Sequence, residues 1–359
     1  MGLRELPDFP WDRLAPYQRI AAGHPDGLVD LSVGAPVDPT PGFVQDALKA
    51  AADAPGYPAT AGSGALQAAM RRWLRRACGV RDAADPALGV APTVGSKEAV
   101  GLLPALLGLG PADLVVFPEL AYPTYAVGAA LTGARTSTSW DDSATLAWVN
   151  SPSNPTGAVV GAEELTAAVR RARAAGVLLA SDECYIEFGY GDAAPVSVLH
   201  PDVCGGSYEG IVALHSLSKR SNLAGYRVAS ISGDPAVVGP LVERRRHTGL
   251  IVPGPVQAAA VAALDDDQHV REQRERYAAR RAVLRPALED AGFRIDASEA
   301  GLYLWATRGE PCLDTVAWLA DRGILVALGD FYGPAGAHHV RIAMTATDER
   351  IAAAAARLC

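Results

Sequence analysis

Three polar side chains follow apolar, strand-like runs in an order that suits covalent chemistry on an amine. Asn154 lies in Ser-Pro-Ser-Asn-Pro-Thr-Gly, Asp182 in Ser-Asp-Glu-Cys-Tyr, and Lys219 closes Ser-Leu-Ser-Lys. The chain has only two other lysines, Lys49 and Lys97. A lysine that follows an apolar strand can be desolvated, which lowers its pKa and makes it a candidate for forming a Schiff base.

Taken singly, each of these residues has an ordinary structural explanation. An Asn-Pro pair usually marks a turn, an Asp after a strand often caps a helix, and a lysine is usually solvated. In open α/β sheets, however, ligands bind beyond the carboxyl ends of the strands. We therefore expect Asn154, Asp182 and Lys219 to converge on one site.

The surrounding pattern predicts the elements that position these residues. Helical and apolar strand-like segments alternate from about 42 to 250, whereas the chain beyond 253 combines a long helical stretch with short strands. We predict an α/β protein with a large, doubly wound, mostly parallel sheet domain at 41–252 and a smaller α+β domain from 1–40 and 253–359. The predicted strands are 113–117, 146–150, 177–182, 211–214, 226–231, 293–295, 302–305 and 339–344, and the predicted helices 63–77, 98–107, 255–292 and one from 348.

Composition excludes several classes of function. The net charge of -8 argues against nucleic acid or an anionic membrane as a partner. The five cysteines include no C-x-x-C pair, so we expect buried thiols and neither a disulfide framework nor a metal site. No apolar run approaches a membrane span, and the segment 1–8 lacks the apolar core of a signal peptide, which indicates a cytoplasmic protein.

Together the motifs resemble the fold-type-I pyridoxal-phosphate (PLP) aminotransferases. That family carries an S-N-P-x-G loop, an acidic residue three before a tyrosine, and S-x-S-K followed by G-x-R; all three are present. The resemblance implies that Asp182 keeps the pyridine nitrogen protonated, and that Lys219 holds the cofactor as an imine and then moves protons. Asn154 and Tyr185 would donate hydrogen bonds to the phenolate oxygen.

The same resemblance implies the remaining binding residues. A phosphate cup would be formed at the start of a helix and around the lysine motif, by Gly95, Ser96, Lys97, Ser216, Ser218 and Arg227. Tyr122 would stack on the ring, and Tyr57 would reach the phosphate of a neighbouring subunit in a homodimer, although a tyrosine that simply fills a turn fits Tyr57 equally well. Arg341 and the backbone of Gly34 would bind the substrate carboxylate. The basic run 244–247 is more typical of a solvated helix face.

Further segments resemble the actinobacterial N-succinyl-diaminopimelate aminotransferase group over essentially the whole chain. They include Asp-Phe-Pro-Trp-Asp at 8–12, Ser-Glu-Ala-Gly-Leu-Tyr-Leu-Trp at 298–305 and Gly-Asp-Phe-Tyr-Gly at 329–333; Ala35 and Leu328 depart from the group's usual Thr and Pro. The implied reaction exchanges an amino group between N-succinyl-L,L-diaminopimelate and 2-oxoglutarate, a step of lysine synthesis. Such polyanionic substrates would fit an arginine-lined pocket.

Other functions remain open at this point. The segments 216–219, 181–183 and 247–249 imitate the S-x-x-K, S-D-N and K-T-G elements of penicillin-binding enzymes, but their order in the chain is wrong. A PLP-fold binding or regulatory module is disfavoured because Asp182 and Lys219 are both present. A C-S lyase, or an aminotransferase for aromatic or other dicarboxylic or N-acylated amino acids, remains compatible with the sequence.

Overall fold

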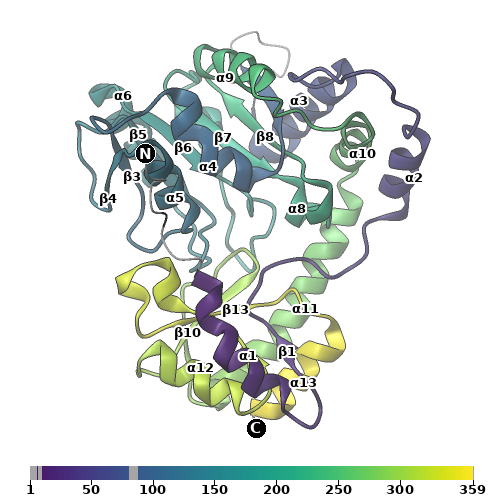
Figure 1. Ribbon diagram of the computed structural model, residues 1–359, viewed down its shortest axis with the longest axis vertical. Helices are drawn as coiled ribbons and strands as arrows, with labels where there is room; N and C mark the ends of the chain where they lie inside the picture. The colour runs from purple at the N-terminus through teal and green to yellow at the C-terminus, as the bar shows by residue number, and fades with distance from the viewer. Residues whose placement is uncertain (1–5, 7–9, 81–87, 359) are drawn as a thin grey trace, which may run out of the picture.

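The computed structural model describes residues 6, 10–80 and 88–358, which form two lobes (Figure 1). The segment 1–8, in which no signal peptide was recognised, lies outside the described residues except for Leu6, as do the first residues of the 8–12 motif and Cys359. Within the described ranges, no helix is long and apolar enough to cross a bilayer. Cytoplasmic location stays a prediction.

The large lobe is built on a seven-stranded sheet in the order β2-β8-β7-β6-β5-β3-β4. All neighbouring strands run parallel except that β8 is antiparallel to β7 and β2. The predicted doubly wound, mostly parallel sheet is therefore confirmed. The strands are β2 (Gly89–Thr93), β3 (Leu114–Val116), β4 (Arg135–Ser137), β5 (Leu146–Asn150), β6 (Leu178–Asp182), β7 (Ile211–Ser216) and β8 (Ala229–Gly233).

Helices cover both faces of this sheet. The helices of the large lobe are α2 (Gly42–Ala50), α3 (Gly64–Cys78), α4 (Ser96–Leu107), α5 (Thr124–Thr132), α6 (Ala162–Ala175), α7 (Pro201–Cys204), α8 (Leu217–Arg220), α9 (Pro235–His247) and α10 (Gly254–Asp265). α4, α5 and α9 pack on one face, and α3, α6 and α10 contribute to the core on the other. The Ser63 side chain caps α3 by accepting a hydrogen bond from the Leu66 amide at 3.2 Å, as the sequence predicts.

The small lobe contains a four-stranded antiparallel sheet in the order β12-β13-β10-β9 and a parallel pair, β1-β11. Its strands are β1 (Val29–Asp30), β9 (Arg294–Asp296), β10 (Tyr303–Thr307), β11 (Ile324–Leu325), β12 (Ala327–Leu328) and β13 (Val340–Ala343). Its helices are the 3-10 turns Pro10–Leu14, Gly329–Tyr332 and Pro334–Gly336, with α1 (Ala15–Ala22), α11 (Gln268–Asp290), α12 (Cys312–Ala320) and α13 (Asp348–Leu358). The helix α1 packs beside α12 in this lobe (Figure 1).

The prediction of one long helix at 255–292 is wrong, because this part of the chain forms two helices, α10 and α11. The Asp266 carboxylate accepts hydrogen bonds from the His269 amide at 2.9 Å and from the His269 ring at 2.6 Å. Such side-chain bonds to nearby backbone compete with a continuous helix. α10 packs in the core of the large lobe through Ala259 and Leu264. We therefore propose that the domain boundary falls after α10 rather than at 252.

Two other local expectations need correction. The strand predicted at 226–231 begins only at Ala229, because Tyr226 ends a 3-10 turn and Arg227 adopts a left-handed φ of 56°. The basic run at 244–247 is not uniformly solvated. Arg245 is buried and pairs through both Nη atoms with Glu98 on the first turn of α4, at 2.8 and 2.9 Å.

Because removing one partner leaves a largely buried charge unpaired, Arg245→Met should lower the free energy of unfolding by about 3 kcal/mol. Arg246→Met is the matched control, since Arg246 forms an exposed pair with Glu243 and should change stability by less than about 0.5 kcal/mol. Urea unfolding followed by circular dichroism measures both values. Equal effects of the two substitutions would contradict a structural role for the Arg245–Glu98 pair.

Candidate active site

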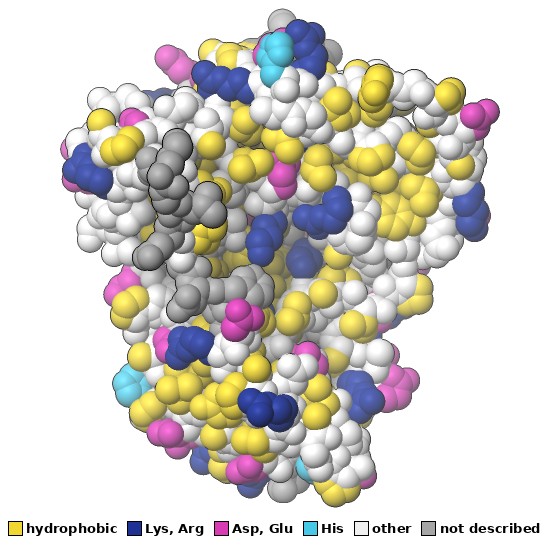
Figure 2. Space-filling model, in the orientation of Figure 1, with side chains coloured by type: hydrophobic (Ala, Val, Ile, Leu, Met, Phe, Trp, Pro, Cys, Tyr) yellow, Lys and Arg dark blue, Asp and Glu magenta, His cyan; other side chains and the backbone are white. Residues whose placement is uncertain are grey.

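A cavity of about 480 Å³ lies at the carboxyl ends of the central strands, between the two lobes. Figure 2 shows Lys and Arg side chains beside the hollow on this face of the molecule. The lining residues are Trp11, Val33, Gly34, Ala35, Ser96, Lys97, Tyr122, Asn154, Asp182, Cys184, Tyr185, Ser216, Ser218, Lys219, Ala224, Arg227, Tyr303 and Arg341. The cavity thus brings together twelve of the fourteen residues predicted from the sequence. Gly95 packs beside Arg227, whereas Tyr57 is fully exposed and lies outside the lining.

Asp182 is a buried carboxylate at the end of β6 without a cationic partner among the described residues. It accepts hydrogen bonds from Tyr125 Oη at 2.9 Å and from the Cys184 amide at 3.2 Å. Burial raises the pKa of the Asp182 carboxyl, and the hydrogen bonds oppose that rise. A protonated ring nitrogen bound beside Asp182 would supply the missing positive charge.

Neighbouring strand ends fix Asn154 next to Asp182. In the sheet register Asn150 of β5 pairs with Asp182, and the Asn150 amide group donates to the Asp182 carbonyl at 2.8 Å. Asn150 Oδ1 in turn accepts a hydrogen bond from the Asn154 backbone amide at 2.7 Å. The loop after β5 therefore turns back over the carboxyl end of β6.

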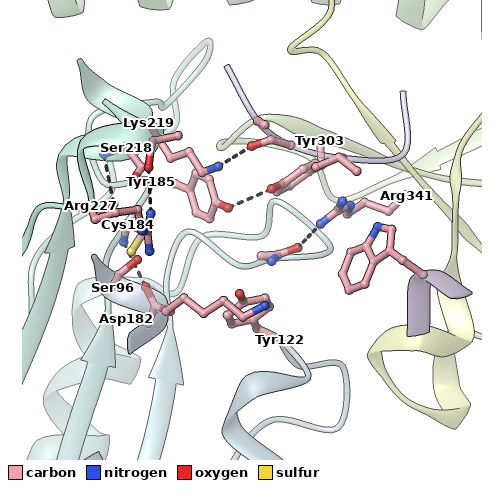
Figure 3. A pocket seen from close by; sticks show the side chains of 18 residues that line it. Ser96, Tyr122, Asp182, Cys184, Tyr185, Ser218, Lys219, Arg227, Tyr303 and Arg341 are labelled. Carbon is pink, nitrogen blue, oxygen red and sulfur yellow. Dashed lines mark hydrogen bonds between the residues drawn. The ribbon is translucent and has the colours of Figure 1, made fainter. Parts of the chain in front are cut away.

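Lys219 lies in the short helix α8, directly after β7, and its amine points into the cavity (Figure 3). Lys219 Nζ donates a hydrogen bond to the Gly34 carbonyl of the N-terminal segment. Burial lowers the pKa of the Lys219 amine. A lowered pKa gives the amine a larger neutral fraction, and the neutral amine attacks a carbonyl group. This is the chemistry required of a Schiff-base lysine.

One end of the cavity could hold a phosphate group. α4 begins after Gly95, at φ 80°, and no side chain caps it. A Cβ at residue 95 would lie 2.2 Å from Arg227 Nη2, so only glycine allows the guanidinium to approach this helix end. Together with Ser216 and Ser218, these groups provide hydrogen-bond donors and positive charge for an anion. The cavity therefore fits both the ring and the phosphate of PLP.

Arg341 lies in mid-strand in β13 and is 3% exposed. Its Nη1 donates to Asn154 Oδ1 at 2.9 Å and its Nη2 to the Ser32 carbonyl at 2.6 Å, while Nε has no partner in the described part of the chain. No carboxylate of the described residues pairs with it. A buried guanidinium requires such a counter-charge, so Arg341 could bind a ligand carboxylate.

Sequence reasoning missed several residues of the site. The Tyr125 hydroxyl donates a hydrogen bond to Asp182, and Tyr303 places its hydroxyl 2.9 Å from the hydroxyl of Tyr185. Trp11, Val33, Ala35, Cys184 and Ala224 also line the cavity. Trp11 and Tyr303 fall inside segments singled out for the family resemblance, Cys184 lies in the motif around Asp182, and Ala35 was noted as a departure from the group. These were the available signals.

The expected arginine-lined substrate pocket is only partly present. Among the described lining residues the cations are Lys97, Lys219, Arg227 and Arg341. Lys97 Nζ lies 6.0 Å from the centre of the Tyr122 ring, near the cavity. The described part of one chain thus offers Arg341 for a substrate carboxylate, beyond the groups suited to the cofactor.

Behind the sheet ends, three potential metal ligands lie close together despite the absence of a sequence motif. Their side chains, from Cys78, Glu183 and His215, are buried within 4.8 Å of one another. Glu183 Oε2 and His215 Nε2 are hydrogen-bonded at 2.8 Å, and His215 Nδ1 has no partner among the residues that the structure describes. Histidine ligands normally donate their second nitrogen to an acceptor. A hydrogen-bonded cluster therefore fits better than a metal site.

Comparisons with known proteins agree with this chemistry. The model of the family "Aminotransferase class I and II" matches residues 26–358. The chain is 59% identical to "Probable aminotransferase Rv1178" of Mycobacterium tuberculosis, over 98% of this chain and 85% of the relative. It is also 59% identical to "4-dedimethylamino-4-oxo-anhydrotetracycline transaminase OxyQ" of Streptomyces rimosus, over 99% of this chain and 100% of that relative.

Among solved structures, the "probable N-succinyldiaminopimelate aminotransferase" of Thermus thermophilus superposes with a TM-score of 0.86. It is 29% identical to this chain, and the match covers 97% of this chain and 98% of that one. The chain therefore belongs to the class I and II aminotransferases and is an enzyme that uses pyridoxal 5'-phosphate.

Proposed function

We propose that Asp182, Lys219, Asn154 and Tyr185 form the catalytic centre of this aminotransferase. The observation that carries the proposal is one cavity that holds both a part-buried lysine amine with a lowered pKa and a buried carboxylate that has no cationic partner among the described residues. The cofactor, when bound, supplies the carbonyl group that accepts the amino group and a ring that stores the electron pair released at the α-carbon.

Asp182 keeps the ring nitrogen protonated, because a buried carboxylate favours a cation beside it. Lys219 anchors the cofactor and, once released, carries a proton between the substrate's α-carbon and the cofactor. Asn154 and Tyr185 donate hydrogen bonds to the phenolate oxygen. Gly95, Ser96, Lys97, Ser216, Ser218 and Arg227 hold the phosphate, and the ring of Tyr122 covers the pyridine face.

Arg341 and Gly34 orient the amino acid. Arg341 binds the α-carboxylate in a bidentate pair, which supplies the counter-charge that the described residues do not give it. The contact of Arg341 with Asn154 keeps the guanidinium directed at the cofactor side of the cavity. Both amino donors and 2-oxo acids carry this carboxylate, so one residue serves both halves of the reaction.

The amino donor we propose is N-succinyl-L,L-diaminopimelate, with 2-oxoglutarate as acceptor, a step of diaminopimelate and lysine synthesis. Support comes from the segments at 8–12, 298–305 and 329–333, and from the similarity to the Thermus thermophilus protein.

A second candidate is amino transfer to a large cyclic ketone. The 59% identity to OxyQ over that protein's full length favours it, as does the apolar part of the lining formed by Trp11, Val33 and Ala35. A polycyclic substrate would pack against these side chains rather than against charges.

We also propose a homodimer in which Tyr57 contacts the phosphate in the neighbouring subunit. Its side chain is fully exposed in the single chain, which is unusual for a tyrosine. A contact across a subunit interface would cover the ring.

A panel of single half-reactions distinguishes the two substrate candidates. Purified enzyme carrying the cofactor is mixed with glutamate, N-succinyl-L,L-diaminopimelate, diaminopimelate, N-acetylornithine, aromatic amino acids or an amino-bearing tetracycline precursor. We expect N-succinyl-L,L-diaminopimelate and glutamate to bleach the visible cofactor band. Bleaching by the tetracycline compound instead would assign the second candidate, and no bleaching by any amino donor would contradict aminotransferase activity.

Lys219→Ala should abolish both turnover and covalent trapping of the cofactor by borohydride. Peptide mass spectrometry of the reduced wild-type protein should locate the cofactor on Lys219. Lys49→Ala is the matched control, because Lys49 lies on the exposed surface beside Asp46. A trapped adduct on Lys97 or Lys49 would overturn the assignment.

Arg341→Ala should lower kcat/KM by about 100-fold for every amino acid that the enzyme accepts, since charge-assisted hydrogen bonds to the shared carboxylate are lost. Steady-state kinetics with two different donors measure the effect. Arg246→Ala, a surface substitution, should leave kcat/KM unchanged for both donors. A loss confined to one donor would show that Arg341 reads the side chain rather than the α-carboxylate.

A further inference from the structure

The hydroxyls of Tyr185 and Tyr303 join the two lobes inside the cavity. Their oxygens lie 2.9 Å apart, both side chains are buried, and the rings meet edge to face with centroids 5.7 Å apart (Figure 3). Tyr185 follows β6 in the large lobe, and Tyr303 begins β10 in the small lobe. This bond therefore depends on the lobes keeping one relative position.

Tyr303 also supports the arginine proposed to bind substrate. β10 pairs with β13 so that Trp305 lies opposite Arg341, and Tyr303 points to the same side of the sheet as Trp305. The guanidinium carbon of Arg341 lies 4.0 Å from the centre of the Tyr303 ring, within the range of a cation–π contact. One side chain thus touches both Arg341 and Tyr185.

The position of the Tyr303 hydroxyl is further constrained by Gly34. A Cβ at residue 34 would lie 2.1 Å from Tyr303 Oη, so the backbone packs directly against the hydroxyl. The carbonyl of the same residue accepts the hydrogen bond from Lys219. The hydroxyl therefore lies where the lysine, the carboxylate site and Tyr185 meet.

We propose that Tyr303 is a positioning residue whose hydroxyl directs the proton of Tyr185 toward the cofactor while its ring holds Arg341 in place. The inference rests on the proposed hydrogen bond from Tyr185 to the phenolate oxygen. Each tyrosine has one proton. When Tyr185 donates its proton to the cofactor, its oxygen can only accept from Tyr303, which makes Tyr185 a stronger donor.

Tyr303→Phe tests the hydroxyl in the holoenzyme, in the absence of substrate. The pH titration of the visible cofactor band reports the protonation of the nitrogen that joins the cofactor to Lys219. Since a weaker hydrogen bond to the phenolate oxygen favours the protonated form, the midpoint should rise by about half a pH unit in Tyr303→Phe and by more in Tyr185→Phe. Tyr190→Phe, which loses a hydroxyl bonded to the Gly301 carbonyl outside the cavity, should not shift it.

The outcomes separate this inference from the proposed function. A shift in Tyr185→Phe without one in Tyr303→Phe would overturn the inference and leave the role of Tyr185 standing. No shift in either variant would overturn both roles. Since no substrate is present, the choice of amino donor does not affect the result.

The ring is tested by comparing Tyr303→Phe with Tyr303→Leu. The phenylalanine keeps the contact with Arg341, so KM should stay unchanged, whereas the leucine should raise KM about tenfold for every amino acid. A thermal melt checks that both variants are folded. Equal KM values in the two variants would contradict the proposal that the Tyr303 ring holds Arg341 in place.

Discussion

A buried carboxylate without a counter-charge is the constraint on which this site depends. Asp182 is almost fully enclosed at the end of β6, held by the Tyr125 hydroxyl and the Cys184 amide. These donors orient the carboxylate but add no positive charge, and burial raises its pKa. Such an arrangement costs folding free energy unless a cation binds beside it. In a PLP enzyme the protonated ring of the cofactor is that cation.

The opposite electrostatic problem occurs on the other side of the same cavity. Arg341 is a buried cation whose described contacts are neutral oxygens and aromatic rings. Asp182 belongs to the large lobe and Arg341 to the small lobe, so each lobe brings one uncompensated charge. The bonds Arg341–Asn154 and Tyr185–Tyr303 connect the two lobes around the space between these charges. Cofactor and amino acid would together neutralise both.

The sequence predicts the parts of the site that follow from strand ends. Asn154, Asp182 and Lys219 meet because the carboxyl ends of parallel strands lie at one edge of the sheet. The partner of Tyr185 could not be predicted, because Tyr303 lies 118 residues away and the contact depends on how two lobes pack. The local sequence pattern also failed to predict that Arg245 is buried, because its partner Glu98 is 147 residues distant.

The most direct test of this account is the protonation state of the cofactor's ring nitrogen, measured by nitrogen-15 magnetic resonance on enzyme reconstituted with ring-labelled PLP. Asp182 should keep that nitrogen protonated well above the pH at which free PLP loses the proton, and Asp182→Ala should abolish the effect. A ring nitrogen that titrates in the wild-type enzyme as it does in free PLP would contradict the account.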